Sequence, residues 1–308
     1  MPNTRGTADT AERMTAAARD WLDSLNPAQR ARALTPWPSD GQAQQRMQEE
    51  RHRWYDTPTD HGGLPLSAMR PGQQGLAMRL LSAGLSEAGY VTACTIIGLE
   101  NVLDRADGWE VDWGRERGRD PQLYWLRVFG EPGPDGPWSW RFGGHHVSVQ
   151  HLVLDGQVAA STPSFLGADP AASPLLGGPS LRPLGASEDL AGELVRSPDA
   201  SQAALAVLAR AQREVLRRLL GTFVERVPAS VARREAAKYA GNRLDTVHFA
   251  WAGSTAPGRP HYFRLQGPGL LAEWDQTQRE ANHVHAVWRD PENDFGDDAL
   301  GRHLALFH

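Results

Sequence analysis

The chain has 308 residues, of which 40% are hydrophobic and 22% are charged, and its formal net charge is −5. This composition excludes wholesale disorder, and the acidic balance argues against a protein that coats nucleic acid. No stretch approaches 18 uninterrupted apolar residues and the first residues lack a signal-peptide pattern, so we expect a cytoplasmic protein without membrane contact.

The single cysteine, Cys94, limits the metal chemistry that this chain can support. One thiol excludes an intramolecular disulfide and a thiolate cluster within one chain, and its place in an apolar helical pattern predicts a small buried side chain. A metal would therefore depend on imidazole and carboxylate ligands. The 11 histidines are unevenly distributed, with three at 145–151 and two at 283–285.

The first third of the chain shows helical spacing. Residues 7–25 and 41–53 predict two helices with a polar outer face, and we expect residues 1–53 to form an N-terminal arm or cap, either a lid or a contact in a homodimer. After a connector rich in Pro and Gly, residues 73–83 and 86–105 predict a helical hairpin. This hairpin would open a single domain over residues 54–308.

The pattern then changes to a period of two, with helices returning between two groups of strands. Residues 123–129 predict a strand, residues 138–156 predict one long strand that ends at the Asp155-Gly156 turn, and residues 163–186 predict a long loop rich in Pro and Gly. The remaining predicted elements are helices at 187–196 and 202–226 and strands at 246–252, 261–267, 269–275 and 282–288. We therefore expect an α+β fold in which a mostly antiparallel sheet carries a His-rich site and packs against helical hairpins.

One potential metal site lies in the last predicted strand. His283 and His285 are two residues apart, so on a strand both imidazoles point to the same face. If residues 276–282 form a hairpin loop, Asp275 opposes His283 and Glu273 opposes His285, which places two carboxylates beside two imidazoles. Glu273 is then a fourth ligand or general base.

Two neighbours of these histidines complete the predicted C-terminal part of the site. Arg289 continues the histidine face and is assigned with Glu273 to the catalytic set. Asp275 and Asn282 are assigned to a substrate pocket.

The second His-rich segment, GGHHVSVQH at 143–151, offers a third ligand. On one continuous strand, His146 and Gln150 share a polar face, which suits the lining of a cavity, so His146 is the favoured ligand and His145 the alternative. Gln150 would touch substrate or bound water. Trp140, next to this segment, is the tryptophan assigned to the pocket, and Trp274 and Trp288 are further candidates for stacking on a substrate.

The acidic run DPENDFGDD at 290–298 does not have the ligand spacing of an EF-hand loop. A structural role is favoured, in which Arg289 pairs with an aspartate of the run and Asp297 caps a helix toward His303.

Several ordered motifs extend over roughly residues 54–308, namely LSAMRPGQQGLAMRLLSAGLSEAGY, WSWRFGGHHVSVQ, PSFLGADP and AEWDQTQREANHVHAVWRDPENDFGDDALGRH. Together they resemble a bacterial family known as domain of unknown function 3500. The resemblance implies no activity. It implies that the GHH and NHVH segments are family signatures and places His146, Glu273, His283 and His285 on matching positions.

The leading hypothesis is an enzyme with one divalent transition metal, copper, iron or manganese, held by His283, His285 and His146. Such a site would oxidise a small organic substrate with dioxygen, by analogy with sites that have three histidines and a glutamate. The alternatives are a zinc hydrolase with the same ligands, a small-molecule binding module without turnover in which Arg289 and Arg264 act as donors, or histidines that are only structural.

Overall fold

The computed structural model describes residues 4–38, 41–109, 114–197 and 210–297, and it confirms the expected α+β class. The helices are α1 (Thr4–Asp23), α2 (Pro27–Ala33), α3 (Gly41–Arg51), α4 (Pro71–Gly84), α5 (Glu87–Ala106), α6 (Gly185–Val195), α7 (Arg210–Val224) and α8 (Ala229–Ala237). The strands are β1 (Leu34–Thr35), β2 (Leu64–Pro65), β3 (Tyr124–Phe129), β4 (Pro137–Gly144), β5 (Val147–Leu154), β6 (Gln157–Ala160), β7 (Ser164–Ala168), β8 (Ser173–Pro174), β9 (Ser180–Leu181), β10 (His248–Gly253), β11 (His261–Gly267), β12 (Leu270–Gln278) and β13 (His283–Arg289).

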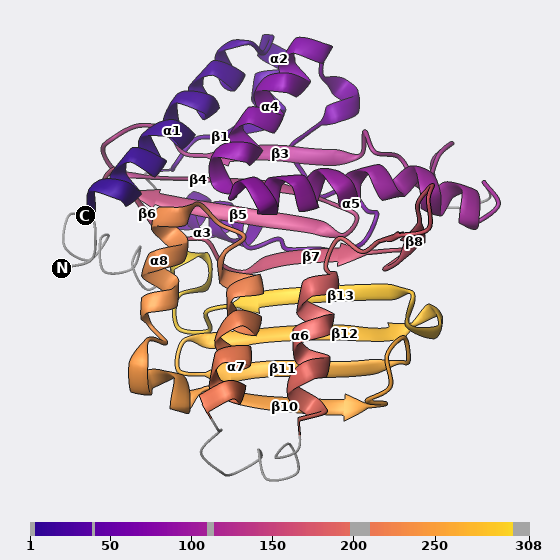
Figure 1. Cartoon of the computed structure of the whole chain (residues 1–308). Coiled ribbons are helices and arrows are strands. Elements are labelled where there is room, and N and C mark those ends of the chain that lie inside the picture. Colours follow the sequence, from indigo (N-terminus) through magenta and orange to yellow (C-terminus); the bar gives the residue numbers. More distant parts are fainter. Residues whose placement is uncertain (1–3, 39–40, 110–113, 198–209, 298–308) are drawn as a thin grey trace.

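The described strands other than β8 and β9 form one large sheet (Figure 1). Its central order is β1-β3-β4-β5-β7-β13-β12-β11-β10, with β2 beside β3 and β6 beside β5. Every pairing is antiparallel except that of β1 with β3. The mostly antiparallel sheet predicted from the alternation of apolar residues is confirmed.

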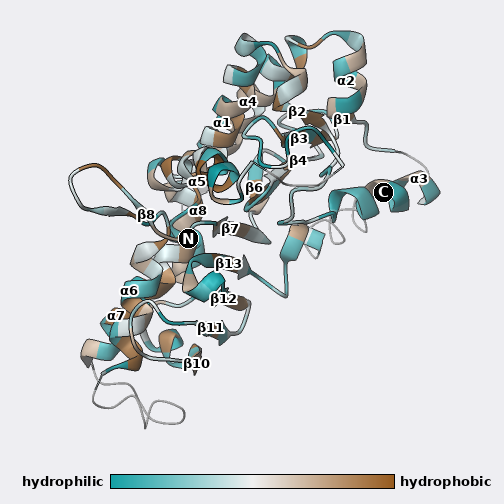
Figure 2. Ribbon diagram, turned by 90° about the vertical axis from the view of Figure 1, so that its right-hand side faces the viewer, coloured by the Kyte–Doolittle hydropathy of each residue, from teal (hydrophilic) through white to brown (hydrophobic). Residues whose placement is uncertain are grey.

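Helices cover the two faces of the sheet unequally (Figure 2). Helices α1, α4, α5, α6, α7 and α8 lie on one face, whereas α3 lies on the other, over the half of the sheet that contains β3, β4 and β5. On β12 and β13, buried and partly exposed residues alternate, so their second face is open. Among the described helices, none is long and apolar enough to cross a membrane.

Helix α1 belongs to the core and is not the arm expected from its polar sequence. Met14 and Trp21 are fully buried and pack in the same hydrophobic cluster as the sheet. The small side chains of Ala17 and Ala18, also buried, explain why the apolar face is difficult to see in the sequence, because Ala contributes little hydrophobic contrast but allows close packing.

The two helices predicted at 73–83 and 86–105 are present as α4 and α5, but they do not form a simple hairpin. In Figure 1, α4 packs beside α1, and α5 then turns to run along the strands. The Ser86 hydroxyl accepts a hydrogen bond from the Gly89 amide (3.0 Å) and fixes the start of α5. Among helices that follow one another along the chain, α6 and α7 pack closely. Residues 202–209 of the predicted helix at 202–226 lie outside the described residues.

The segment predicted as a long loop at 163–186 contains a central strand. Strand β7 pairs with both β5 and β13, and its residues are buried on both faces. A short strand covered on both sides shows no alternation of apolar and polar residues, and the flanking Pro and Gly residues favoured the interpretation as a loop. This strand joins the two His-rich segments.

Candidate metal centre

Strands β4 and β5 are separated by a tight turn at His145-His146, so the prediction of one long strand at 138–156 was wrong. His146 has a φ of 61°, in the left-handed region, which costs a residue with a Cβ about 1–3 kcal/mol. The turn is held on two sides: the His146 amide donates to the Asp56 carbonyl (3.1 Å), and the Gly167 amide donates to the His146 carbonyl (2.8 Å). His146 therefore reaches the site from a turn and not from the face of a strand.

Glycine is required at position 167 in β7 because the His146 ring lies against it. A Cβ on Gly167 would stand 2.9 Å from His146 Cδ2 and 2.8 Å from the Val284 carbonyl oxygen. This close approach lets the imidazole reach strand β13.

His283 and His285 lie on one face of β13, as predicted from their spacing, but the predicted register with β12 was wrong by two residues. Asp275 opposes His285, and Gln278 opposes His283. The register shifts between Asp275 and Gln278, and the strands are joined by a short 3-10 turn at Arg279–Ala281 with left-handed residues. Because the shift is an even number of residues, the carboxylates stay on the histidine face.

The three imidazoles of His146, His283 and His285 converge through their Nε2 atoms. The Nε2 atom of His146 lies 2.8 Å from that of His283 and 3.3 Å from that of His285. All three residues form a group whose ligand atoms lie within 4.8 Å of one another. Nitrogen ligands of a tetrahedral zinc ion stand roughly 3.3 Å apart, which the separation between His146 and His285 matches, whereas that between His146 and His283 would widen by about 0.5 Å on metal binding.

Carboxylates face the other nitrogen of two of these rings. Asp169 Oδ2 lies 3.8 Å from His283 Nδ1, and Asp56 Oδ2 lies 3.8 Å from His285 Nδ1. A carboxylate on this side favours the tautomer with the proton on Nδ1 and leaves the Nε2 lone pair for a cation. Nε2 atoms that converge in this way need either a cation or a shared proton between them.

Burial keeps the three imidazoles uncharged at neutral pH. Burial, together with the neighbouring histidines, lowers the pKa of His283 to about 3, and the same causes lower the pKa of His146 well below its ordinary value. Burial also lowers the pKa of His285, although Asp56 and Asp275 act in the opposite direction. The neutral imidazole is the form that binds a metal.

His145, the alternative ligand, supports the centre from behind. Its Nδ1 donates to Glu100 Oε1 (2.5 Å), its ring stacks on His146 with 3.7 Å between centroids, and its carbonyl accepts from the Tyr124 hydroxyl (2.7 Å). Glu100 and Tyr124 are both buried. His145 therefore fixes the position of His146 and does not belong to the converging group.

A pocket of about 290 Å³ opens beside His285, on the uncovered face of the sheet. Its walls come from residues 54–56, from β7 and from strands β11, β12 and β13. Among the predicted site residues, Glu273, Asp275 and His285 line it.

Glu273 lies in this pocket and outside the histidine group. Its Oε1 accepts a hydrogen bond from the Tyr262 hydroxyl (2.5 Å), and it stands opposite Val287 in β13. Burial and the bond to Glu273 raise the pKa of Tyr262 to about 12, so the phenol stays protonated and keeps donating. The structure therefore places Glu273 as a pocket carboxylate, two residues along β12 from the position that faces His285.

Two predicted pocket residues have other roles. Trp140 is fully buried under the helix layer, where its ring packs on His151 and against Gly84. Gln150 is buried and donates to the Thr162 carbonyl. Gln150 was assigned to the site on the assumption of one continuous strand. Because the strand breaks at the turn, Gln150 lies on the face of the sheet that α3 covers and away from the pocket.

The remaining predicted residues also lie outside the pocket. The side-chain oxygen of Asn282 accepts from the Ala172 amide (2.8 Å), and Arg289 donates to Asp294 Oδ2 (2.6 Å). Asn282 thus fixes a loop, and Arg289 is not placed for catalysis. Trp274 and Trp288 are buried in the core.

The acidic run at 290–298 forms ion pairs, as its structural interpretation predicted. Asp290 pairs with Lys238 (2.8 Å), and Asp297 pairs with the buried guanidinium of Arg51 (2.6 Å). Asp298 and the predicted helix toward His303 lie outside the described residues.

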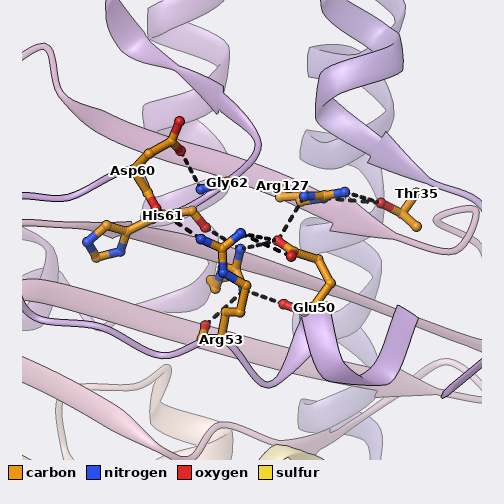
Figure 3. A network of polar contacts seen from close by, with 8 residues as sticks. Thr35, Glu50, Arg53, Asp60, His61, Gly62 and Arg127 are labelled. Atoms are coloured by element: carbon orange, nitrogen blue, oxygen red, sulfur yellow. Dashed lines mark hydrogen bonds and ion pairs between the residues drawn. The ribbon is translucent and has the colours of Figure 1, made fainter. Parts of the chain in front are cut away.

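Residues 52–63 bring Asp56 to the centre and are held at both ends by Arg141 of β4. Arg141 is buried and donates to the carbonyls of Glu50 (2.6 Å), Arg53 (2.8 Å) and His61 (2.5 Å). The Glu50 carboxylate also accepts from Arg141 and contacts Arg53, and Figure 3 shows it among its polar partners. This network positions the pocket wall.

Asp56, Gly167 and Asp169 were not among the site residues predicted from the sequence. Gly167 and Asp169 belong to PSFLGADP, one of the motifs that carried the family resemblance, so the signal was present but was assigned to a loop. Asp56 follows Trp54 and Tyr55 in a connector without periodicity, where no pattern distinguishes a functional carboxylate from a solvated one.

A family model described as "Protein of unknown function (DUF3500)" matches residues 7–211 and 204–297. The chain belongs to this family. No curated protein and no solved structure matches it. Family membership confirms the resemblance seen in the sequence, and the chemical interpretation of the site depends on its own residues.

Proposed function

We propose that this chain is a metal-dependent enzyme that holds one divalent transition metal on His146, His283 and His285 and acts on a small organic molecule. The observation that carries the proposal is the convergence of three uncharged imidazoles through Nε2, with carboxylates facing Nδ1 of two of them. Copper, iron and manganese are the expected metals because oxidation requires a redox-active metal, and zinc is the alternative because imidazole ligands suit zinc as well as copper and iron.

The pocket beside His285 supplies the substrate site of the proposed enzyme. A metal on three histidines supplies an open position at which dioxygen or water is activated. Aromatic side chains of the wall exclude water from the substrate, and Asp275, opposite His285, is placed to move a proton. The Tyr262 bond holds Glu273 in one orientation.

Oxidation by dioxygen is the proposed chemistry. The three converging ligands are neutral, and the pocket that adjoins them contains several aromatic side chains, which suits an organic substrate. Hydrolysis with zinc is the second candidate, supported by Asp56 and Asp275 beside His285, either of which could accept a proton from water. The single cysteine agrees with a reducing compartment, and we propose the cytoplasm.

Elemental analysis of protein purified without a histidine tag tests whether the chain binds one metal ion. We expect about one equivalent of metal per chain and its loss in His283→Ala and in His285→Ala, because two imidazoles leave an incomplete ligand set. His248→Ala is the matched control, since His248 is exposed on β10, and it should keep the wild-type metal content.

The identity of the metal then separates the two chemistries. Copper, iron or manganese with dioxygen uptake would support oxidation, whereas zinc with hydrolysis of ester or amide substrates would support the second candidate. Protein that takes up no metal after reconstitution, or that keeps it in both histidine variants, would refute the metal enzyme and favour a binding module.

A further inference from the structure

The charged side chains that line the pocket beside the histidine group are acidic. Three carboxylates line it, those of Asp56, Glu273 and Asp275, and no lysine or arginine among the described residues does.

The cations nearest to this pocket neutralise it only in part. Arg264 opposes Glu273 in the ladder between β11 and β12, and its exposed side chain contacts Tyr262, so it offsets some of the charge of Glu273 without lining the pocket. Arg53 lies over the Tyr55 ring, 5.4 Å from its centroid, and forms an ion pair with Glu50 (3.0 Å). A divalent metal would add two positive charges against three carboxylates, at the end of the pocket that His285 marks.

Aromatic rings supply a second kind of contact in the same space. Trp54, Tyr55, Phe165 and Tyr262 line the pocket, and the faces of such rings attract an ammonium or guanidinium group. The Tyr262 hydroxyl donates a hydrogen bond to Glu273 and so holds this carboxylate beside the Tyr262 ring. Carboxylate and aromatic faces together form the combination that recognises an organic cation.

The register of β12 sets the distance between Glu273 and the part of the pocket beside His285. Asp275 opposes His285, and Glu273 lies two residues further along β12, roughly 7 Å away. We propose that the substrate is a small organic cation, whose ammonium or guanidinium group is bound by Glu273 and the aromatic wall while its reactive end lies about 7 Å away, beside His285. The assignment of a reactive end rests on the proposed function.

Binding of a panel of cations to the full chain tests this substrate class. Phenethylamine, choline and agmatine are compared with 2-phenylethanol and 3-phenylpropanoate, by calorimetry, in metal-free and metal-loaded protein. At least one cation should bind roughly tenfold or more tighter than the neutral alcohol, with the carboxylate weakest, because a charged hydrogen bond inside a pocket gives about this discrimination.

Two variants assign the binding to the pocket. Glu273→Gln keeps the shape and should weaken cation binding about 10- to 100-fold, while the affinity for 2-phenylethanol stays within about twofold. Glu193→Gln, on the exposed side of α6, is the matched control and should change neither affinity.

The outcomes separate this inference from the metal enzyme. Cation binding that depends on Glu273 in protein without metal would support the substrate class even if the metal proposal failed. Equal or tighter binding of 3-phenylpropanoate to metal-free protein, no binding of any cation in either form, or unchanged cation affinity of metal-free Glu273→Gln would overturn the inference.

Discussion

The two halves of the sheet differ in how many of their faces are covered. Strands β4 and β5 are buried almost without interruption because helices lie on one face and α3 with residues 52–63 on the other. Strands β12 and β13 alternate between buried and partly exposed residues because helices cover only one face. The same kind of strand therefore carries buried polar side chains in one half and a polar open surface in the other.

The candidate metal centre lies where the double covering ends. His146 comes from the turn at the end of the covered hairpin, and His283 and His285 come from the first strand of the open half. The covered half supplies rigid support, and the open half supplies access. This boundary explains why the imidazoles can be largely buried and still adjoin a pocket.

The largest expected effect comes from breaking the double covering at Arg141. Arg141→Met removes the guanidinium that holds residues 52–63 and leaves its carbonyl and carboxylate partners unpaired in a buried site, so it should destabilise the fold by about 3–5 kcal/mol. Burial lowers the pKa of Arg141 only to about 10, so it is charged at neutral pH. Chemical denaturation measures the change.

The matched change on the open half is Arg264→Met, at an exposed guanidinium of β11. It should alter the free energy of unfolding by less than about 0.5 kcal/mol. Similar changes in the free energy of unfolding for Arg141→Met and Arg264→Met would show that the covering of the second face does not distinguish the two halves.

A smaller effect is expected at Asp169, behind His283. Asp169→Asn removes the charge that favours the proton on His283 Nδ1 and should weaken metal affinity about 10- to 100-fold, measured by competition with a chelator. Asp189→Asn, in α6 and exposed, should leave the metal affinity unchanged. Wild-type metal affinity in Asp169→Asn would show that this carboxylate does not orient His283.

The covered half should also make the protein sensitive to acid. Burial lowers the pKa of His61 to about 4 and that of His151 to about 3, below the ordinary value of about 6.5 in the unfolded chain. The unfolded chain therefore takes up protons first, so the stability from these neutral histidines is fully present above pH 6.5 and is lost as the pH falls toward 4. Each group contributes a slope of up to about 1.4 kcal/mol per pH unit.

Urea denaturation of metal-free protein at pH 7.5, 6 and 5 measures this slope. His61→Gln should reduce the slope of unfolding free energy with pH, whereas His248→Ala on the open half should leave this slope unchanged. A free energy of unfolding that stays constant from pH 7.5 to 5 would contradict burial of these histidines in their neutral form.

Much of the fold could be predicted from the spacing of apolar residues. The strands near 124–129, 261–267 and 283–289 and the helices α4, α5 and α6 agree with their predicted ranges to within a few residues. Most of these elements bury one face or stripe, which produces a regular pattern in the sequence, although β3 is buried on both faces. In β7, which is short, covered on both faces and flanked by Pro and Gly, no such pattern is present and the prediction failed.

The site was partly predictable for the same reason. His283 and His285 were placed on one face by their spacing alone, and an even register shift preserved the side on which Asp275 lies. His146 joined them through a left-handed turn that no Gly or Asn signals, since glycines precede the turn and histidines occupy it. Asp56 and Asp169 depend on long-range contacts that a local pattern cannot encode.

The most direct test of the metal centre is X-ray absorption at the metal edge of protein loaded with one equivalent of metal, together with the His146→Ala variant. The predicted result is a first shell that contains three imidazole nitrogens at about 2.0–2.1 Å in the wild type and one fewer in the variant. A first shell with no more than one imidazole, or one that is unchanged in His146→Ala, would contradict a metal bound by His146, His283 and His285.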